Sequence, residues 1–193
     1  VFNKDFRAIS SKQSIEAGIG MVHQHFMLVD NFTVLENVVL GSEGGALITE
    51  SLSNARVELT RLAKEYGLEV ELDIAVEELS VGMQQRVEIL KGLYKGAKVL
   101  ILDEPTGVLT PQESDELFRI FEALKKQGVT IILITHKLRE IMSITDNVSV
   151  MRAGKMVAHR ETSKTNPEEL AELMIGRKVL LNIKKSKAKS GNP

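Results

Sequence analysis

The sequence contains no cysteine and no tryptophan, and aromatic residues make up only 4% of its 193 residues. Without cysteine, a disulfide framework and a cysteine-based zinc site are both excluded. Neither charge is in excess, since 25 lysines and arginines face 26 aspartates and glutamates. The composition therefore gives no reason to expect a nucleic-acid partner. No run of about 18 apolar residues occurs, so the chain is not expected to span a membrane.

The phosphate-binding pattern G-x-x-x-x-G-K-[ST] is also missing. The only Gly-Lys pair, Gly154 and Lys155, is followed by Met156. No loop of this sequence is thus expected to wrap the α- and β-phosphates of a nucleotide. The chain starts with Val1 and shows no basic-then-apolar leader pattern. We interpret these features together as the loss of an N-terminal part.

What the sequence does contain is an alternation of strand and helix patterns. Three short apolar runs, at residues 19–23, 99–103 and 129–135, predict β-strands, the last two of them buried. The predicted helices are residues 53–66, residues 81–94, residues 111 to about 127, residues 137 to about 144, and one opened by Asn166. A hairpin, VSVM-RAGK-MVAH, precedes the last helix. This order predicts an α/β fold with a parallel sheet, and such sheets bind ligands at the carboxyl ends of their strands.

Several helix ends and faces are also marked in the sequence. In the helix at residues 53–66, Val57 and Leu59 are expected on the apolar face. Ser80 is the natural N-cap of the next helix. Thr110 and Glu113 predict a capping box for the helix after that.

Two carboxylates, Asp103 and Glu104, follow an apolar strand directly, and Pro105 ends the strand. In P-loop NTPases an aspartate in this place holds the magnesium ion, and Mg²⁺ prefers one or two carboxylates together with waters and phosphate oxygens. A second carboxylate beside it can orient or deprotonate an attacking water. A strand end with two solvated acids explains the pair equally well when it is taken by itself.

Other polar side chains follow the other two strands. His136 comes directly after ILIT and could donate to a γ-phosphate oxygen, although a half-buried histidine bonded to backbone is the more ordinary explanation. Gln24 follows the first strand. His23 and His25 flank it at a spacing that would suit metal ligands, but no third ligand is near in sequence, so we expect both to be structural.

The segment LSVGMQQR, residues 79–86, opens a predicted helix. Ser80 as a cap and Gly82 in the first turn would expose backbone N–H groups and the positive end of the helix dipole. Such a helix start is a ready site for an anion. A plain N-cap explains the same residues without any ligand.

The order of these motifs resembles that of the ABC ATPases. Gln24, LSVGMQQRVEI, VLILDEPT and ILITH stand where that family has its Q-loop, signature, Walker B strand and switch histidine. The resemblance covers nearly all of the chain up to about Val179. It implies an α/β fold with a P-loop NTPase-like parallel sheet core and a helical subdomain at about residues 32–92, with the N-terminal part missing. Residues 1–182 would be a partial ABC nucleotide-binding domain, and residues 183–193 a linker or tail.

The resemblance also implies roles for individual residues, with ATP and Mg²⁺ as the ligands. Asp103 would bind the magnesium ion as the Walker B aspartate. Gln24, as the catalytic glutamine of the Q-loop, would touch the ion or the water and would couple to the membrane subunit. Glu104 would be the catalytic carboxylate and His136 the switch histidine. The signature would meet the γ-phosphate of a nucleotide held mainly by an opposing ATPase domain, through Ser80, Val81, Gly82 and Met83.

Apart from the missing phosphate-binding loop, the sequence departs from the common family pattern at three positions. Val81 and Met83 replace a Gly and the Gln of the usual LSGGQ signature, and Thr110 stands where the D-loop usually ends in Asp. With MVHQHFMLVDNFTVLENVVLG, these features resemble the importers of nucleosides and simple sugars, in which two ATPase domains share one chain. The resemblance implies the first of these domains, peripheral on the cytoplasmic face of the cell membrane. Its partners would be transmembrane permease subunits, a second ABC ATPase domain and, indirectly, a solute-binding protein, with no nucleic acid.

Two other functions stay open at this point. A chain without the phosphate-binding loop could be a non-catalytic ABC half that supplies its signature to another ATPase domain. A soluble ABC protein of DNA repair or translation would carry long coiled-coil or basic insertions, and residues 24–79 contain none. The apolar stretch at residues 26–40 suits contact with a membrane subunit, although ordinary core explains most of it as well.

Overall fold

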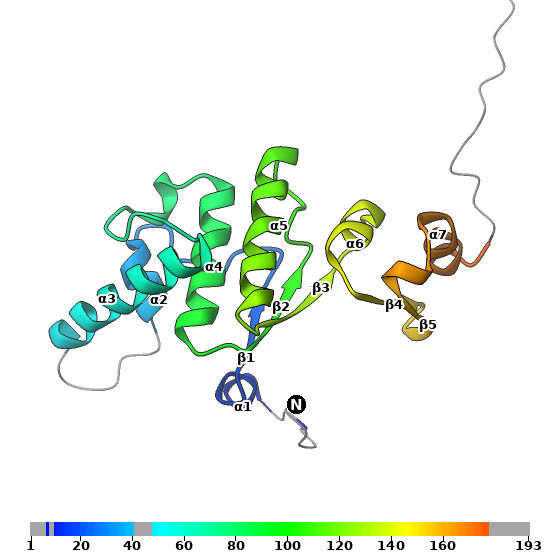
Figure 1. Cartoon of the computed structure of the whole chain (residues 1–193). Coiled ribbons are helices and arrows are strands. Elements are labelled where there is room, and N and C mark those ends of the chain that lie inside the picture. Colours follow the sequence, from blue (N-terminus) through cyan, green and yellow to red (C-terminus); the bar gives the residue numbers. More distant parts are fainter. Residues whose placement is uncertain (1–6, 8–9, 41–47, 178–193) are drawn as a thin grey trace, which may run out of the picture. The chain divides into compact units, whose positions relative to one another are not determined.

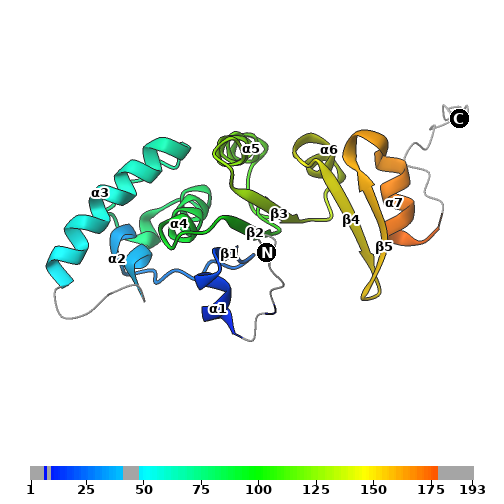
Figure 2. The ribbon, with the colours of Figure 1, turned by 60° about the horizontal axis from the view of Figure 1, so that its bottom comes forward.

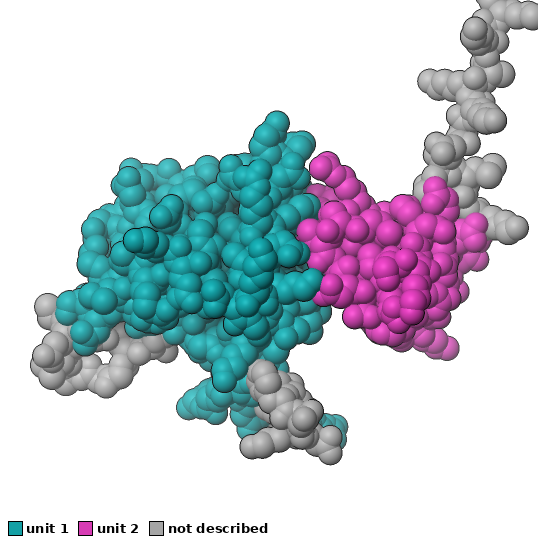
Figure 3. Space-filling model, in the orientation of Figure 1, with its two compact units in different colours: residues 1–135 teal, residues 136–193 magenta. Residues whose placement is uncertain are grey.

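The computed structural model describes residue 7, residues 10–40 and residues 48–177. The chain falls into two compact units, residues 1–135 and residues 136–193 (Figure 3). The predicted linker or tail at residues 183–193 lies outside the described residues. Among the described residues the elements are, in chain order (Figure 1), α1 (Ser11–Glu16), β1 (Ile19–Val22), α2 (Val34–Val39), α3 (Ile48–Tyr66), η1 (Val76–Glu78), α4 (Val81–Tyr94), β2 (Val99–Asp103), α5 (Pro111–Lys126), β3 (Thr130–Ile134), α6 (Leu138–Ile144), β4 (Asn147–Arg152), β5 (Lys155–Glu161), η2 (Thr162–Lys164) and α7 (Pro167–Ile175).

The first unit is built on a parallel three-stranded sheet in the order β1-β2-β3. Its register places Val22 beside Leu102, and Leu102 beside Leu133. The three predicted strands are therefore confirmed to within one residue at each end, as is the parallel α/β class. Because all three strands are parallel, the segments that follow them leave from the same edge of the sheet.

Helices α4 and α5 cover one face of this sheet (Figure 2). Leu100 and Leu102 on β2 point into this layer and are fully buried. Two glycines allow the close approach: a Cβ on Gly92 of α4 would lie 3.0 Å from the Leu100 Cδ2 atom, and one on Gly20 of β1 would lie 3.1 Å from it. The core of the unit therefore lies between β2 and the helices, and Leu100 packs closely against both glycines.

The opposite face of the sheet is partly exposed, and one prediction is wrong there. The run at residues 129–135 predicts a buried strand, yet the side chains of β3 are alternately exposed and half-buried. Ile132 and Ile134 are 47% and 46% exposed, and Met21 on the same face is 44% exposed. The reason is position, because β3 is an edge strand in the described sheet and only one of its faces meets α5.

Helix α3 begins five residues earlier than residues 53–66 predict. Leu59 and Leu62 are buried against α2 and α4, as predicted, and Gly67 follows the helix with a φ of 68°. The prediction that Val57 lies on the apolar, buried face is wrong, since this residue is 73% exposed. It lies two residues before Leu59, which at 3.6 residues per turn places it on the far side of the helix.

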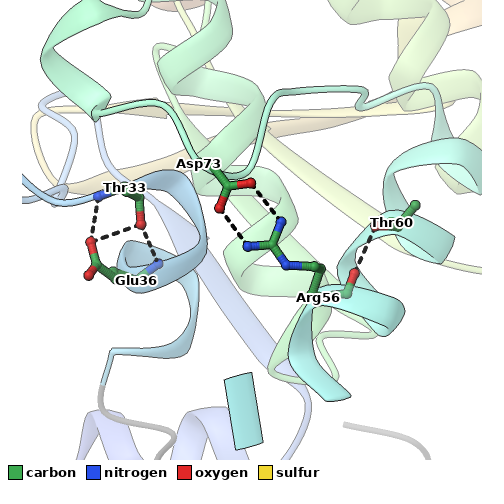
Figure 4. A network of polar contacts seen from close by, with 5 residues as sticks. All are labelled: Thr33, Glu36, Arg56, Thr60 and Asp73. Carbon is green, nitrogen blue, oxygen red and sulfur yellow. Dashed lines mark hydrogen bonds and ion pairs between the residues drawn. The ribbon is translucent and has the colours of Figure 1, made fainter. Parts of the chain in front are cut away.

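Polar contacts secure the helices beside the sheet (Figure 4). At the start of α2, the backbone N–H of Thr33 donates to Glu36 Oε2 at 2.8 Å, and the N–H of Glu36 donates to Thr33 Oγ1 at 3.2 Å. Arg56 on α3 donates to both carboxylate oxygens of Asp73, at 2.9 and 2.5 Å, which lowers the pKa of Asp73. Both side chains are largely exposed, so the ion pair orients α3 more than it stabilises the fold.

Helix α5 matches its prediction. Thr110 and Glu113 form the expected capping box, with Pro111 in the first turn. The backbone N–H of Thr110, and after it the Thr110 hydroxyl, lower the pKa of Glu113. Gly128 adopts a φ of 84° just beyond the helix, a conformation that favours glycine.

The second unit contains α6, the antiparallel hairpin β4-β5, and α7. The predicted hairpin is confirmed, and its turn passes through Ala153 and Gly154, both with positive φ. Asn166 caps α7 as predicted, with its side chain accepting from the N–H of Glu169. A small core joins the three elements, formed by Ile141, Val148, Val150, Ala158 and Leu170.

Candidate functional site

The carboxyl end of β2 carries the acidic pair. Asp103 is the last residue of the strand and pairs in register with Ile134 of β3. Glu104 follows in the left-handed region, with a φ of 47°, while its N–H donates to the Ile134 carbonyl at 2.9 Å. This backbone costs a non-glycine residue about 1–3 kcal/mol and is most often retained at functional positions. Both acids are half-buried, which fits groups that meet a ligand better than fully solvated ones.

Gln24 leaves the sheet at the same edge. It lies two residues beyond the end of β1 and is exposed, and β1 pairs directly with β2. The topology thus brings an amide oxygen and two carboxylates to neighbouring strand ends. His23 and His25 are exposed as well, and no group of three metal-binding side chains gathers anywhere in the described part of the chain.

The start of α4 has the geometry of an N-cap site. Ser80 Oγ accepts from the N–H of Met83 at 3.4 Å, and Val81 is 41% exposed. A Cβ on Gly82 would lie 3.0 Å from Glu113 Oε1, so glycine is what lets the first turn of α4 pass beside the capping residue of α5. Sequence analysis predicted the cap, and the structure adds the reason for the glycine.

His136 lies two residues after the end of β3 and is the first residue of the second unit. It is exposed. The structural explanation of this histidine required a half-buried residue.

A cavity of about 100 Å³ lies between the N-terminal turns of α4 and α5. An ion pair between Arg86 and Glu116, at 2.6 Å, closes one side. Inside the cavity wall is Gln85, which is 1% exposed and whose Oε1 and Nε2 atoms have no hydrogen-bond partner among the described residues. Sequence analysis missed Gln85, although its place four residues before Ile89 puts it on the buried face of the helix.

We expect the change Gln85→Leu to raise the free energy of unfolding by about 1–2 kcal/mol, because an unpaired buried amide costs about that much. Urea unfolding of the 193-residue chain measures it. The neighbouring Gln84→Leu is the matched control, because Gln84 Nε2 donates to the carbonyls of Val76 and Leu79 and its loss should destabilise the chain. Equal destabilisation by both changes would contradict the prediction.

Comparison with known proteins agrees with this fold. The chain resembles solved structures, among them that of cbiO1 from Clostridium perfringens, described as part of the ABC transporter complex cbiONQ. That match has a TM-score of 0.68 and 31% identity, and it covers 87% of this chain and 66% of that one. The fold is therefore of the P-loop NTPase type, as predicted.

A family model described as ABC transporter matches residues 1–107. Among curated relatives, the nucleoside import ATP-binding protein NupA of Lactococcus lactis is 51% identical, over 93% of this chain and 35% of the relative. The ribose import ATP-binding protein RbsA of Streptococcus agalactiae is 42% identical, over 90% of this chain and 36% of the relative. The chain belongs to the ABC transporter family, and it spans about a third of the length of these relatives. No helix in the described ranges is long and apolar enough to cross a membrane.

Proposed function

We propose that the chain is the ATP-binding and ATP-hydrolysing part of an ABC importer for nucleosides or simple sugars, which energises transport through a membrane permease. The names of the relatives support the substrate class, since one imports nucleosides and another ribose. The observation that supports ATP hydrolysis is at the end of β2, where Glu104 follows Asp103 and has a strained backbone conformation.

Four residues that end or follow the three strands in sequence would divide the chemistry between them. Asp103 and Gln24 would hold Mg²⁺, because their oxygen atoms suit this ion and lie at neighbouring strand ends. The ion, when bound, neutralises charge on the phosphates. Glu104 orients the attacking water and accepts its proton. His136 donates to the γ-phosphate oxygen on which charge develops.

The start of α4 would serve a different nucleotide. Its capped first turn, residues 80–83, presents N–H groups at the positive end of the helix dipole. We place there the γ-phosphate of an ATP held mainly by a second ABC ATPase domain. Val81 and Met83 add exposed or half-buried apolar contact beside Ser80 and Gly82.

The proposal also includes the partners and the place of action. A longer protein that joins this chain to a segment with the missing phosphate-binding loop, called the full-length protein below, would work with transmembrane permease subunits, with a second ABC ATPase domain and, indirectly, with a solute-binding protein. It would lie peripherally on the cytoplasmic face of the cell membrane.

Calorimetric titration with ATP and Mg²⁺ tests the proposal on two proteins. The full-length protein should bind ATP and hydrolyse it. The 193-residue chain should show weak binding or none, because no G-x-x-x-x-G-K-[ST] loop occurs in it to hold the α- and β-phosphates. Micromolar binding by the 193-residue chain would contradict the expectation for this chain. Absence of hydrolysis by the full-length protein, with its permease present, would overturn the proposed function.

A further inference from the structure

The segment between β1 and α2 carries Gln24 and forms neither helix nor strand up to Thr33. Its main chain is nevertheless held in place by side chains of α4. The N–H of Met27 donates to Glu88 Oε1 at 2.8 Å, and Lys91 Nζ donates to the carbonyl oxygen of Met27 at 2.9 Å. Both polar backbone groups of one residue are thus held from a single helix.

Glu88 and Lys91 are three residues apart on α4 and therefore share a face of the helix. Glu88 is only 5% exposed, so its carboxylate has left water. Burying such a group is unfavourable unless hydrogen bonds compensate, and the N–H of Met27 supplies one of them. The hydrogen bond from Met27 thus explains a glutamate on the buried face of α4 better than packing does.

The next part of the segment is fixed from another helix. Asn37 on α2 is fully buried, accepts from the N–H of Val29 at 2.7 Å and donates to the Val29 carbonyl at 2.9 Å. The backbone of Met27 therefore follows α4, and the backbone of Val29 follows α2. Gln24, three residues before Met27, lies on the α4 side of this division.

A cavity of about 190 Å³ borders the hydrogen bonds between α4 and Met27. It is lined in part by His23, Met27, Glu88, Lys91 and Gly92. The segment therefore borders unfilled space on the side where it meets α4. Helix α4 is a single 14-residue helix whose first turn is the proposed contact for the nucleotide of a second domain. Glu88 lies about two turns further along the same helix.

We propose that Glu88 and Lys91 are positioning residues that couple the first turn of α4 to Gln24. This inference rests on the proposed function. When the start of α4 engages a nucleotide, the helix sets the place of Met27 and, through the two residues between them, the place of Gln24 beside the acidic pair. The same link runs in the other direction, from a permease that moves the segment to the nucleotide at α4, because coupling between two sites is reciprocal.

The test uses the full-length protein with and without its permease in lipid vesicles. Glu88→Ala should lower the ratio of permease-stimulated to basal ATP hydrolysis by about fivefold or more, the lower range of coupling between sites. Glu88→Gln keeps an acceptor oxygen and should restore most of the ratio. Lys91→Met removes the second bond from a half-buried position and should lower the ratio in the same way. Glu122→Gln, an exposed change on α5, is the control and should leave the ratio unchanged.

Hydrogen exchange separates this role from a purely structural one. In Glu88→Ala the amide of Met27 should exchange about tenfold faster, the loss expected for one hydrogen bond, while amides in β2 keep their protection. An equal loss of basal and stimulated rates, with faster exchange throughout the unit, would overturn the inference. An unchanged ratio in Glu88→Ala would overturn it too, and a wild-type protein without any ATP turnover would overturn the proposed function instead.

Discussion

Glu104→Gln in the full-length protein is expected to lower the rate of ATP hydrolysis by about 10²–10⁴-fold, the contribution typical of a general base. Glutamine keeps the size of the side chain but cannot accept the proton of the attacking water. ATP binding should persist, because Glu104 follows the proposed magnesium ligand Asp103 and does not replace it. Steady-state phosphate release measures the rate, and equilibrium titration with ATP measures the binding.

The control for this change is Glu122→Gln, which alters the same functional group at an exposed position of α5. It should leave the turnover rate unchanged. If Glu104→Gln retains the wild-type rate, the assignment of Glu104 as the catalytic carboxylate is wrong. A loss of ATP binding together with the rate would instead assign Glu104 to nucleotide binding.

Leu100→Ala is expected to lower the free energy of unfolding of the first unit by about 2–5 kcal/mol, the usual cost of a large-to-small change in a core. Leu100 is fully buried, and Gly20 and Gly92 lie against it. Neither glycine has a side chain that could refill the space. Urea unfolding of the 193-residue chain, followed by circular dichroism, measures the change.

Ile132→Ala is the matched change on the uncovered face of the sheet. Ile132 is 47% exposed, so its truncation should cost about 1 kcal/mol or less. Equal costs for the two changes would mean that the two faces of the sheet are equally packed in solution, contrary to the structure.

Local signals in the sequence were enough to predict much of the fold. The capping box of Thr110 and Glu113 and the glycine at position 128 defined α5 because caps depend on residues within one turn of the helix. The apolar run that ends at Asp103 predicted β2. Pairing of this strand with β1 on one side and β3 on the other confirmed the prediction. The acidic pair at its end was placed correctly for the same reason, since the end of a strand follows from where its apolar run stops.

The predictions that failed depended on neighbours that the sequence does not show. Val57 fits an apolar helix pattern as well as Leu59 does, and only the position of α2 and α4 decides which side of α3 is buried. The strand β3 has the composition of an interior strand but lies at an edge of the described sheet. Apolar composition shows what a strand can bury, and the packing of other elements decides what it does bury.

By itself the sequence determined the α/β class, the order of the motifs and the family, because each rests on residues close together along the chain. Only the tertiary structure decided the environment of Gln85 and Glu88, which are neighbours on one helix. Gln85 faces the cavity beside α5 and has no hydrogen-bond partner in the described part of the chain, whereas Glu88 accepts from the backbone of Met27, 61 residues away in sequence. A hydrogen bond across that separation depends on how the helix and the sheet pack, so the sequence around either residue cannot reveal it.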